Sequence, residues 1–316
     1  MNNLTISVVI PTYQRPKYLE MAVVSLLNQS QLPDEILMIS RDDDENTNKK
    51  AKELIDRYSG MVKIENYHVI EPGFLPPIEK GIEYATSEIV AFLDDDAEAY
   101  PEWIYQLITT YKNSTIGGVG GRYENYFNFE LVEYKKHSIS AKITWYGKFI
   151  GNLISEPISN SLIDADFFIG GNMSFRRKIL NEITIDPVLK KNVSFHWEID
   201  VCQQVKKLNY TLIYNPNIIV KHHTAPREIE GNRTINYDAS YYTNFNHAYI
   251  VFKHLSLLSK LTYPIYTFLI GSKNSSGLLY LLYSILIKRS LDMKNDIIPS
   301  LKGRIDGIRL PNKTKF

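Results

Sequence analysis

The chain has 316 residues, of which 44 % are hydrophobic, enough to bury one large domain or two unequal ones, and this excludes a disordered or fibrous protein. Its 36 Lys and Arg residues nearly balance 35 Asp and Glu residues, and a net charge of +1 provides no global attraction to nucleic acid. The single cysteine, Cys202, excludes an internal disulfide framework and a cysteine-based zinc cluster. We therefore expect no nucleic-acid partner and a reducing compartment.

The N-terminus leads directly into a first strand. Met1–Leu4 contains neither a basic segment nor a long apolar segment of the kind found in a cleaved secretion signal. We therefore expect a cytoplasmic protein, with the inner face of the cell membrane as the alternative location.

Strand and helix patterns alternate over the first hundred residues. Short β-branched or apolar runs predict strands, and apolar residues at helical spacing predict helices. The strands are expected at Thr5–Ile10, Glu35–Ile39, Val62–Ile64 and Ile89–Leu93, and the helices at Tyr18–Leu27, Asn46–Tyr58 and Ile78–Ala85. This alternation predicts an α/β fold with a doubly wound, mostly parallel sheet.

Three consecutive aspartates, Asp94, Asp95 and Asp96, follow the apolar strand Ile89–Leu93. Ligands of open α/β sheets gather at the carboxyl ends of parallel strands. Three neighbouring carboxylates repel one another and are costly to bury, so a cation or strong hydrogen-bond donors are expected beside them. The alternative is an acidic turn before the helix that Pro101 begins, because acidic residues favour helix N-termini.

The pattern becomes less regular beyond residue 110. Gly117–Gly121 matches neither a dinucleotide fingerprint nor a phosphate loop and indicates tight strand geometry. An irregular region to about residue 163 precedes the segment Gly170–Arg177, which is expected to form a loop. A helix near Glu198–Leu208 and apolar runs at Thr211–Tyr214 and Ile218–Val220 then lead to a histidine pair.

The C-terminal segment, residues 237–316, forms a second predicted region after a main domain at residues 1–236. Its apolar run Leu278–Ile287 is far shorter than the roughly 20 residues of a spanning helix, and charged residues and Pro264 interrupt Ala248–Ile270. We expect either an amphipathic helical tail in a membrane interface, with Lys288 and Arg289 at its edge, or a helix pair packed on protein.

Four motifs in this order resemble the family 2 inverting glycosyltransferases, which have a GT-A fold. They are Val8–Arg15 (VVIPTYQR), Phe92–Asp96 (FLDDD), Gly170–Arg177 (GGNMSFRR) and Trp197–Asp200 (WEID). The resemblance covers roughly residues 4–225 and leaves the C-terminal segment unexplained.

This resemblance implies a metal centre at the aspartates. Asp96 is the expected metal ligand and Asp94 a donor contact, with Asp95 placed beside the donor without a defined role. His222 matches a family position that completes the metal shell or contacts the diphosphate, whereas His223 is expected to point to the opposite face of its strand. Hard cations such as Mn²⁺ or Mg²⁺ suit carboxylate ligands.

The resemblance also implies a catalytic base at the start of a helix. Glu198 is the expected base, which would take a proton from the acceptor hydroxyl. Asp200 is the alternative, but it lies two residues further on and could instead serve as a cap or ion-pair partner.

The remaining family positions concern the donor and the acceptor. Pro11, Tyr13 and Arg15 are expected at the nucleotide, and Gly171, Asn172 and Arg176 at the acceptor. The acid that commonly binds the nucleobase is replaced by a different sequence after the second strand. Arg41 and Asp44 are candidates for that role, and a solvated charged loop is the alternative.

The sequence thus predicts metal-dependent, inverting transfer of a sugar from a nucleotide-sugar donor to a glycan or lipid-linked acceptor. A nucleotidyltransferase acting on a sugar phosphate is one alternative, although the segment after the first strand is a poor triphosphate loop. A non-catalytic glycan-binding protein is the other. Peripheral membrane contact is a further expectation, and the oligomeric state is left open.

Overall fold

The computed structural model describes residues 4–135, 141–151, 153–154, 160–190, 195–224, 237–272, 275–287 and 292–313. The chain forms two compact units. The first unit consists of Met1–Lys142, Gly151–Ile185 and Val201–Pro226, and the second of Ile143–Ile150, Asp186–Asp200 and Arg227–Phe316.

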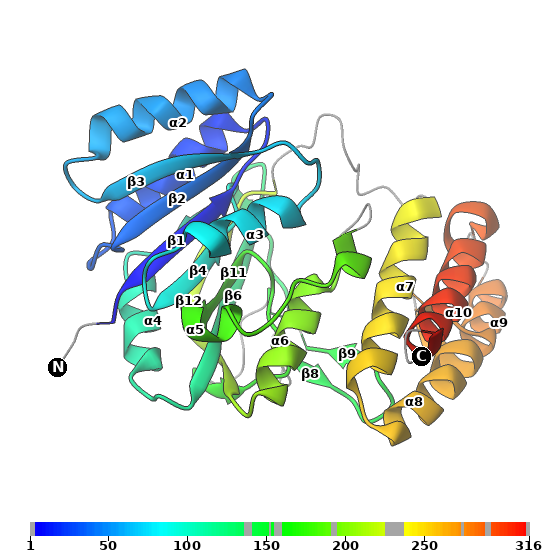
Figure 1. Ribbon diagram of the computed structural model, residues 1–316. Helices are drawn as coiled ribbons and strands as arrows, with labels where there is room; N and C mark the ends of the chain where they lie inside the picture. The colour runs from blue at the N-terminus through cyan, green and yellow to red at the C-terminus, as the bar shows by residue number, and fades with distance from the viewer. Residues whose placement is uncertain are drawn as a thin grey trace. The chain divides into compact units, whose positions relative to one another are not determined.

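The first unit contains a large sheet and the helices that cover it (Figure 1). Its strands are β1 (Ile6–Pro11), β2 (Glu35–Arg41), β3 (Lys63–Val69), β4 (Ile89–Leu93), β5 (Ala97–Ala99), β6 (Ile116–Phe127), β7 (Glu130–Leu131), β10 (Ile163–Asp164), β11 (Asn172–Arg176) and β12 (Thr211–His222). Its helices are α1 (Pro16–Leu27), α2 (Glu45–Tyr58), α3 (Leu75–Tyr84), α4 (Trp103–Tyr111) and α5 (Arg177–Leu180).

The strand order is β10-β12-β6-β11-β4-β1-β2-β3, with β5 paired to β12 and β7 to β6. Neighbours among β3, β2, β1 and β4 are parallel, as are β6 and β12, whereas β11 runs antiparallel to both β4 and β6. The predicted α/β fold with a mostly parallel sheet is confirmed. The carboxyl ends of β1, β2 and β4 consequently meet at one edge of the sheet.

Strand β1 is buried on both faces, as its mostly apolar sequence predicts. Ile6, Val8 and Ile10 pack in a core with apolar side chains of α1, α2 and α4. Val9 points to the other face, where Gly81 of α3 approaches it closely. The alternation of side chains along the strand therefore attaches both helical layers to the sheet.

Some expected segments have different bounds in the structure. The two apolar runs after residue 210 form one strand, β12, whose pairing with β6 shifts register between Tyr214 and Ile219. A bulge interrupts the regular strand pattern at this point, and the sequence therefore predicts two separate runs where the structure has one strand. Gly117–Gly121 lies within β6, as expected, and residues 172–176 form strand β11 rather than a loop.

The second unit is mainly helical. Its elements are β9 (Phe149–Ile150), η1 (Pro187–Lys190), α7 (Tyr237–His254), α8 (Leu257–Pro264), η2 (Ile265–Ile270), β13 (Gly271–Ser272), β14 (Ser275–Ser276), α9 (Leu278–Leu286), η3 (Met293–Ile297) and α10 (Ile298–Lys313). Strand β8 (Lys142–Ile143) and helix α6 (Trp197–Lys207) cross the division between the units. Helices α7 and α10 pack along each other.

The expected C-terminal region is mainly helical where the structure describes it. No helix within the described ranges is both long and apolar enough to cross a bilayer. Lys288 and Arg289 lie outside the described residues. Residues 225–236 also lie outside them, so the boundary between residues 236 and 237 stays a prediction.

Replacing Gly81 by Ala should destabilise the first unit. A Cβ atom at Gly81 would lie 2.2 Å from Val9 Cγ1, which is too close for van der Waals contact. Overpacking of this kind typically costs about 1–3 kcal/mol. Urea unfolding should show this loss for Gly81→Ala, whereas Gly60→Ala, where the new Cβ meets no atom within 4 Å, should not lower the stability. Equal effects of the two substitutions would contradict this packing argument.

Candidate functional site

The three aspartates lie where β4 ends. The Asp96 carbonyl accepts a hydrogen bond of 2.8 Å from the His223 backbone, and β5 then runs antiparallel to the end of β12, with His222 opposite Ala97. The end of β12 is therefore held beside the aspartate turn by main-chain hydrogen bonds. This pairing explains why residues about 126 positions apart meet, since strand-end side chains converge at one sheet edge.

Asp94, Asp96 and His222 form a candidate divalent-cation site. Each offers one ligand atom, and these atoms lie within 4.8 Å of one another. His222 Nε2 is 3.4 Å from Asp96 Oδ1, while its Nδ1 is 3.0 Å from the Asn125 side-chain oxygen. An Nδ1–H that donates to Asn125 would leave Nε2 available for a cation, which is the usual arrangement of a metal-binding histidine. Two carboxylates and an imidazole are a donor set that suits a divalent cation.

The electrostatics of the cluster also favour a cation. Burial, followed by the negative charge of Asp96, raises the pKa of Asp94. Burial also raises the pKa of Asp95 to about 7, against the opposing influence of Arg15. Since a nearby positive charge favours ionised carboxylates, a divalent cation would reduce the repulsion among these groups.

Arg15 supplies the positive side chain of this cluster. It stands at the N-cap of α1, and its Nη1 lies 2.9 Å from Asp95 Oδ1 and 3.1 Å from Asp96 Oδ2. Burial lowers the pKa of Arg15, but Asp95 and Asp96 outweigh that effect and raise it. The structure thus brings the predicted nucleotide residue Arg15 to the predicted metal residue Asp96.

Tyr123 and Asn125 were not predicted as site residues. The Tyr123 hydroxyl donates to Asp94 Oδ2 at 3.0 Å, and its ring stacks on His222 with a centroid distance of 4.9 Å. Both residues follow the glycines of β6 at a spacing of two, which places them on the same face of the strand. The two-residue spacing is visible in the sequence. The pairing of Asn125 with His222, however, depends on the long-range register of β6 and β12.

Gly171 lies directly against the cluster. A Cβ atom there would be 2.1 Å from Asp94 Cγ and 2.2 Å from the Tyr123 hydroxyl. The neighbouring Asn172 is buried, and its side chain forms hydrogen bonds to other parts of the fold. Its amide oxygen accepts from Trp103 Nε1 at 2.9 Å, and its amide nitrogen donates to the carbonyls of Arg122 and Ile218. Gly171 is therefore a site-lining position, whereas Asn172 holds the strands together.

Arg176 is not brought to the aspartates, contrary to its predicted place at the site. Because β11 runs antiparallel to β4, Asn172 pairs with Leu93 beside the cluster and Arg176 pairs with Ile89 at the opposite end. The Arg176 guanidinium donates to the carbonyls of Ile116, Tyr111 and Asn113. Residues 172–176 form a strand and not the expected loop, and the extended strand carries Arg176 away from the site.

The residues predicted at the nucleotide lie in two adjoining loops. Pro11 ends β1, paired with Ile39 of β2, and the Arg41 guanidinium lies 4.2 Å from the Tyr13 ring centroid. Asp44 caps α2 by accepting from the Thr47 backbone at 3.2 Å, and its other oxygen accepts from the backbone of Gln14. Asp44 therefore joins the loops after β1 and β2, and a role in binding a nucleobase stays a prediction for Arg41 and Asp44.

His222 and His223 have different partners. His222 faces Asp96, whereas His223 Nε2 contacts Glu98 Oε1. The two rings thus leave β12 in different directions.

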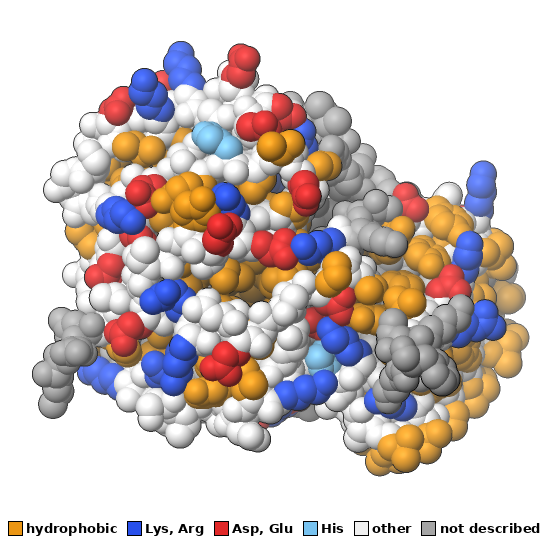
Figure 2. Space-filling view, viewed as in Figure 1, with side chains coloured by type: hydrophobic (Ala, Val, Ile, Leu, Met, Phe, Trp, Pro, Cys, Tyr) orange, Lys and Arg blue, Asp and Glu red, His pale blue; other side chains and the backbone are white. Residues whose placement is uncertain are grey.

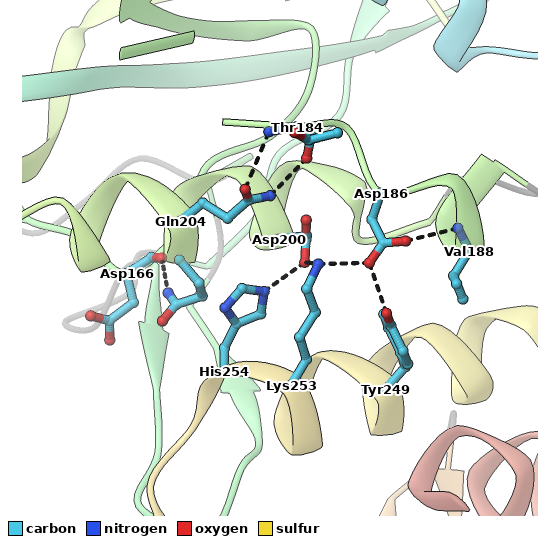
Figure 3. A network of polar contacts seen from close by, with 10 residues as sticks. Asp166, Thr184, Asp186, Val188, Asp200, Gln204, Tyr249, Lys253 and His254 are labelled. Carbon is cyan, nitrogen blue, oxygen red and sulfur yellow. Dashed lines mark hydrogen bonds and ion pairs between the residues drawn. The ribbon is translucent and has the colours of Figure 1, made fainter. Parts of the chain in front are cut away.

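Glu198 and Asp200 open helix α6, and Asp200 is buried within a polar network of the second unit (Figure 3). Asp200 Oδ1 accepts from Lys253 Nζ at 2.7 Å and lies 2.6 Å from His254 Nε2. Lys253 also contacts Asp186 Oδ2 at 2.6 Å. Burial alone would raise the pKa of Asp200, but His254 and Lys253 outweigh burial and lower it. Asp200 is an ion-pair partner in this network, and Glu198 is a half-buried residue on the same helix.

Comparison with known proteins places these features in a family. The profile described as "Glycosyl transferase family 2" matches residues 7–184, which is more than half of the chain. A dolichol-phosphate mannosyltransferase of Pyrococcus furiosus is 26% identical over 58% of this chain and 50% of its own length. A glucosyl-dolichyl phosphate glucuronosyltransferase of Haloferax volcanii is 25% identical over 69% of each protein.

Solved structures share the fold. GalNAc-T7, crystallised with UDP, GalNAc and Mn²⁺, superposes with a TM-score of 0.67 at 17% identity, covering 93% of this chain and 59% of that one. TarS 1-349 of S. aureus in complex with UDP-GlcNAc gives a TM-score of 0.61 at 14% identity, covering 96% and 82%. These likenesses confirm the GT-A-type fold, while this chain spans only half to two thirds of several relatives.

Excess Mn²⁺ should raise the thermal unfolding midpoint through the cluster of Asp94, Asp96 and His222. A ligand at a hundred times its dissociation constant stabilises the folded state by about 2.7 kcal/mol. Differential scanning fluorimetry should show this shift for the wild type and its loss in Asp96→Asn. Asp42→Asn, which alters an exposed carboxylate, is the matched control and should keep the shift. An equal Mn²⁺ shift in Asp96→Asn would exclude this site.

Asp200→Asn should destabilise the protein in a pH-dependent manner. The pKa of Asp200 is lowered in the folded state, so its ionised form stabilises the fold above the unfolded pKa of about 3.9, and this contribution disappears as the pH falls. Breaking a buried ion pair costs roughly 3 kcal/mol. Urea unfolding should therefore show a large difference from the wild type at pH 7 that shrinks below about pH 4.

The matched control for this experiment is Asp238→Asn, an exposed aspartate in the first turn of α7. Its effect should stay within about 0.5 kcal/mol, as is usual for surface substitutions. A pH-independent loss of stability in Asp200→Asn would argue against the ion-pair explanation.

Proposed function

Because the chain belongs to glycosyl transferase family 2, we propose that it transfers a sugar from a nucleotide-sugar donor to a hydroxyl group of a glycan or lipid-linked acceptor. The observation that carries this proposal is the grouping of Asp94, Asp96 and His222 at the carboxyl edge of the sheet. The transfer is proposed to be metal-dependent and to invert the anomeric centre.

Asp96 and His222, together with Asp94, would hold Mn²⁺ or Mg²⁺. When bound, such a cation neutralises the charge that develops on the leaving diphosphate. Arg15 lies beside the same carboxylates and would bind a phosphate oxygen of the donor, since guanidinium groups suit phosphate geometry. Part of the pairing of Arg15 with Asp95 and Asp96 would then be exchanged for contacts with the donor.

Gly171 would support the proposed contact between Asp94 and the donor, because it has no side chain. The space that a Cβ would occupy is already filled by Asp94 and the Tyr123 hydroxyl. A larger residue at this position would displace Asp94, which donates no hydrogen bond when ionised and depends on its neighbours for its orientation. Gly171 therefore acts as a positioning residue for Asp94.

Glu198 is proposed as the catalytic base that receives the proton of the acceptor hydroxyl. Asp200, the alternative, already interacts with Lys253 and His254, and the resulting fall in its pKa makes it a weaker base. Side chains two residues apart on a helix point about 200° apart, so the Glu198 side chain leaves α6 in a different direction from that of Asp200. These two observations support Glu198 over Asp200.

A lipid-linked acceptor is favoured by the relatives, two of which are named as acting on dolichol-linked substrates. A lipid phosphate would present the same chemistry to the enzyme as the donor phosphates, namely an anionic oxygen that a guanidinium can bind. The proposed acceptor is therefore a glycan carried on a polyprenyl phosphate, and a sugar hydroxyl of that glycan would attack the donor.

A nucleotide-sugar panel tests the proposal most directly. The protein would be incubated with each nucleotide-sugar and a sugar linked to a polyprenyl phosphate, in the presence of Mn²⁺ or of EDTA. The proposal expects a sugar-lipid product that forms with Mn²⁺ but not with EDTA, and NMR of the product should show an inverted anomeric configuration. Consumption of a nucleoside triphosphate with a sugar phosphate would instead support a nucleotidyltransferase.

Glu198→Gln should reduce turnover about 10²–10⁴-fold, the usual contribution of a general base. The donor affinity should stay nearly unchanged, because the substitution removes a proton acceptor and keeps the side-chain shape. Steady-state kinetics and donor titration measure the two effects separately. Glu182→Gln, at an exposed glutamate, is the control. Full turnover by Glu198→Gln would refute its assignment as the base.

A further inference from the structure

The second unit contains a helical hairpin with apolar side chains on its outside. Helix α8 continues into η2, the short strands β13 and β14 pair antiparallel and reverse the chain, and α9 packs back against η2. We name α8, η2, β13, β14 and α9 the apolar hairpin. Its exposed side chains are Leu257, Leu258, Leu261, Ile265, Leu269, Ile270, Leu278, Leu279, Leu282, Tyr283, Ile285 and Leu286. Figure 2 shows hydrophobic side chains gathered along this part of the second unit.

Most of the buried side chains of the apolar hairpin are polar, although Tyr263 of α8 packs in an apolar cluster. In α9 only Ser284 is buried, although leucine, isoleucine and tyrosine fill the rest of the helix. Thr267 of η2 is also buried. The Arg304 side chain, itself fully buried, donates to the carbonyls of Thr267 and Ser276. In water the apolar groups would be buried and the polar ones exposed, so this element has the opposite polarity from a water-facing surface.

Positive charge is concentrated in the C-terminal part of the chain that contains the apolar hairpin. Residues 237–316 contain eleven Lys and Arg residues and four Asp residues, a net charge of +7, in a chain whose total is +1. Residues 1–236 are consequently acidic, with a net charge of −6. A basic segment with a wide apolar face has the composition of elements that lie in anionic lipid surfaces.

We propose that the apolar hairpin inserts into one leaflet of an anionic lipid bilayer. Lipid tails would cover the exposed leucine and isoleucine side chains, while the buried serine, threonine and arginine groups keep their partners inside the protein. The positive charge of residues 237–316 would add attraction to anionic headgroups. The hairpin lies outside residues 7–184, so this inference does not depend on the proposed transferase reaction.

The lengths of the helices limit the depth of insertion. Helix α8 and η2 have 8 and 6 residues, and α9 has 9 residues. At about 1.5 Å per residue the longer arm extends roughly 20 Å, less than the roughly 30 Å of a hydrocarbon core. The hairpin therefore enters from one side and returns to the same side.

A second copy of the chain is a poorer occupant of this face. A symmetric dimer through the hairpin would bring two segments of the same +7 charge together. Like charges across an interface oppose association, whereas an anionic bilayer neutralises them. The exposed face also continues around most of α9 rather than along a single stripe, as expected for a helix surrounded by lipid.

Vesicle flotation with the full-length protein tests the proposal. Vesicles of phosphatidylcholine alone are compared with equimolar phosphatidylcholine and phosphatidylglycerol, at low and at high salt. The proposal expects binding to the anionic vesicles that weakens, without vanishing, at high salt. Leu282→Asp and Leu286→Asp should each lower vesicle partition about tenfold or more, the scale of a leucine side chain removed from an apolar medium.

Ile70→Asp is the matched control, because Ile70 of the first unit and Leu286 of α9 have the same exposed fraction, 81%. Ile70→Asp should bind vesicles like the wild type. Circular dichroism and the thermal midpoint should be unchanged in all three variants. No binding of the wild type to anionic vesicles, or equal binding by Leu286→Asp, would refute the proposal. Sedimentation velocity showing a dimer that only the leucine variants dissociate would assign the face to a second copy.

Discussion

The candidate site depends on how negative charge is compensated at the end of β4. Three aspartates follow one another there, and burial makes their ionised forms costly. Arg15 contacts two of them, and His222 lies beside one. The surrounding fold supplies these partners from the loop after β1 and from the end of β12. The same requirement for positive charge makes the cluster suited to a divalent cation and to the phosphates of a donor.

Main-chain pairing determines which residues can take part in that compensation. Because β11 is antiparallel to β4, Gly171 lies against Asp94 while Arg176 is carried to the opposite end of the strand. The pairing of β6 with β12 likewise places Asn125 beside His222. Strand direction and register thus separate residues that supply chemistry from residues of similar type that only hold the sheet together.

The second unit shows the same separation of roles between similar residues. Asp200 interacts with Lys253 and His254 near the start of α6, and Glu198 is the residue proposed for proton transfer. The apolar hairpin extends the contrast to a whole surface, because most of its buried residues are polar and most of its leucines are exposed. A surface of that kind is stable where the surrounding medium is itself apolar.

Sequence alone determined the alternation of strands and helices, the parallel character of the sheet and the family, because apolar periodicity and short motifs are local signals. The resemblance to the family also pointed to Asp94, Asp96 and His222, which the structure brings together. Only the tertiary structure decided that Arg176 lies away from them, that Tyr123 touches Asp94, and that the apolar residues of α9 face outward. These outcomes depend on strand direction, register and burial, which arise from contacts between residues far apart in the chain and leave no local pattern in it.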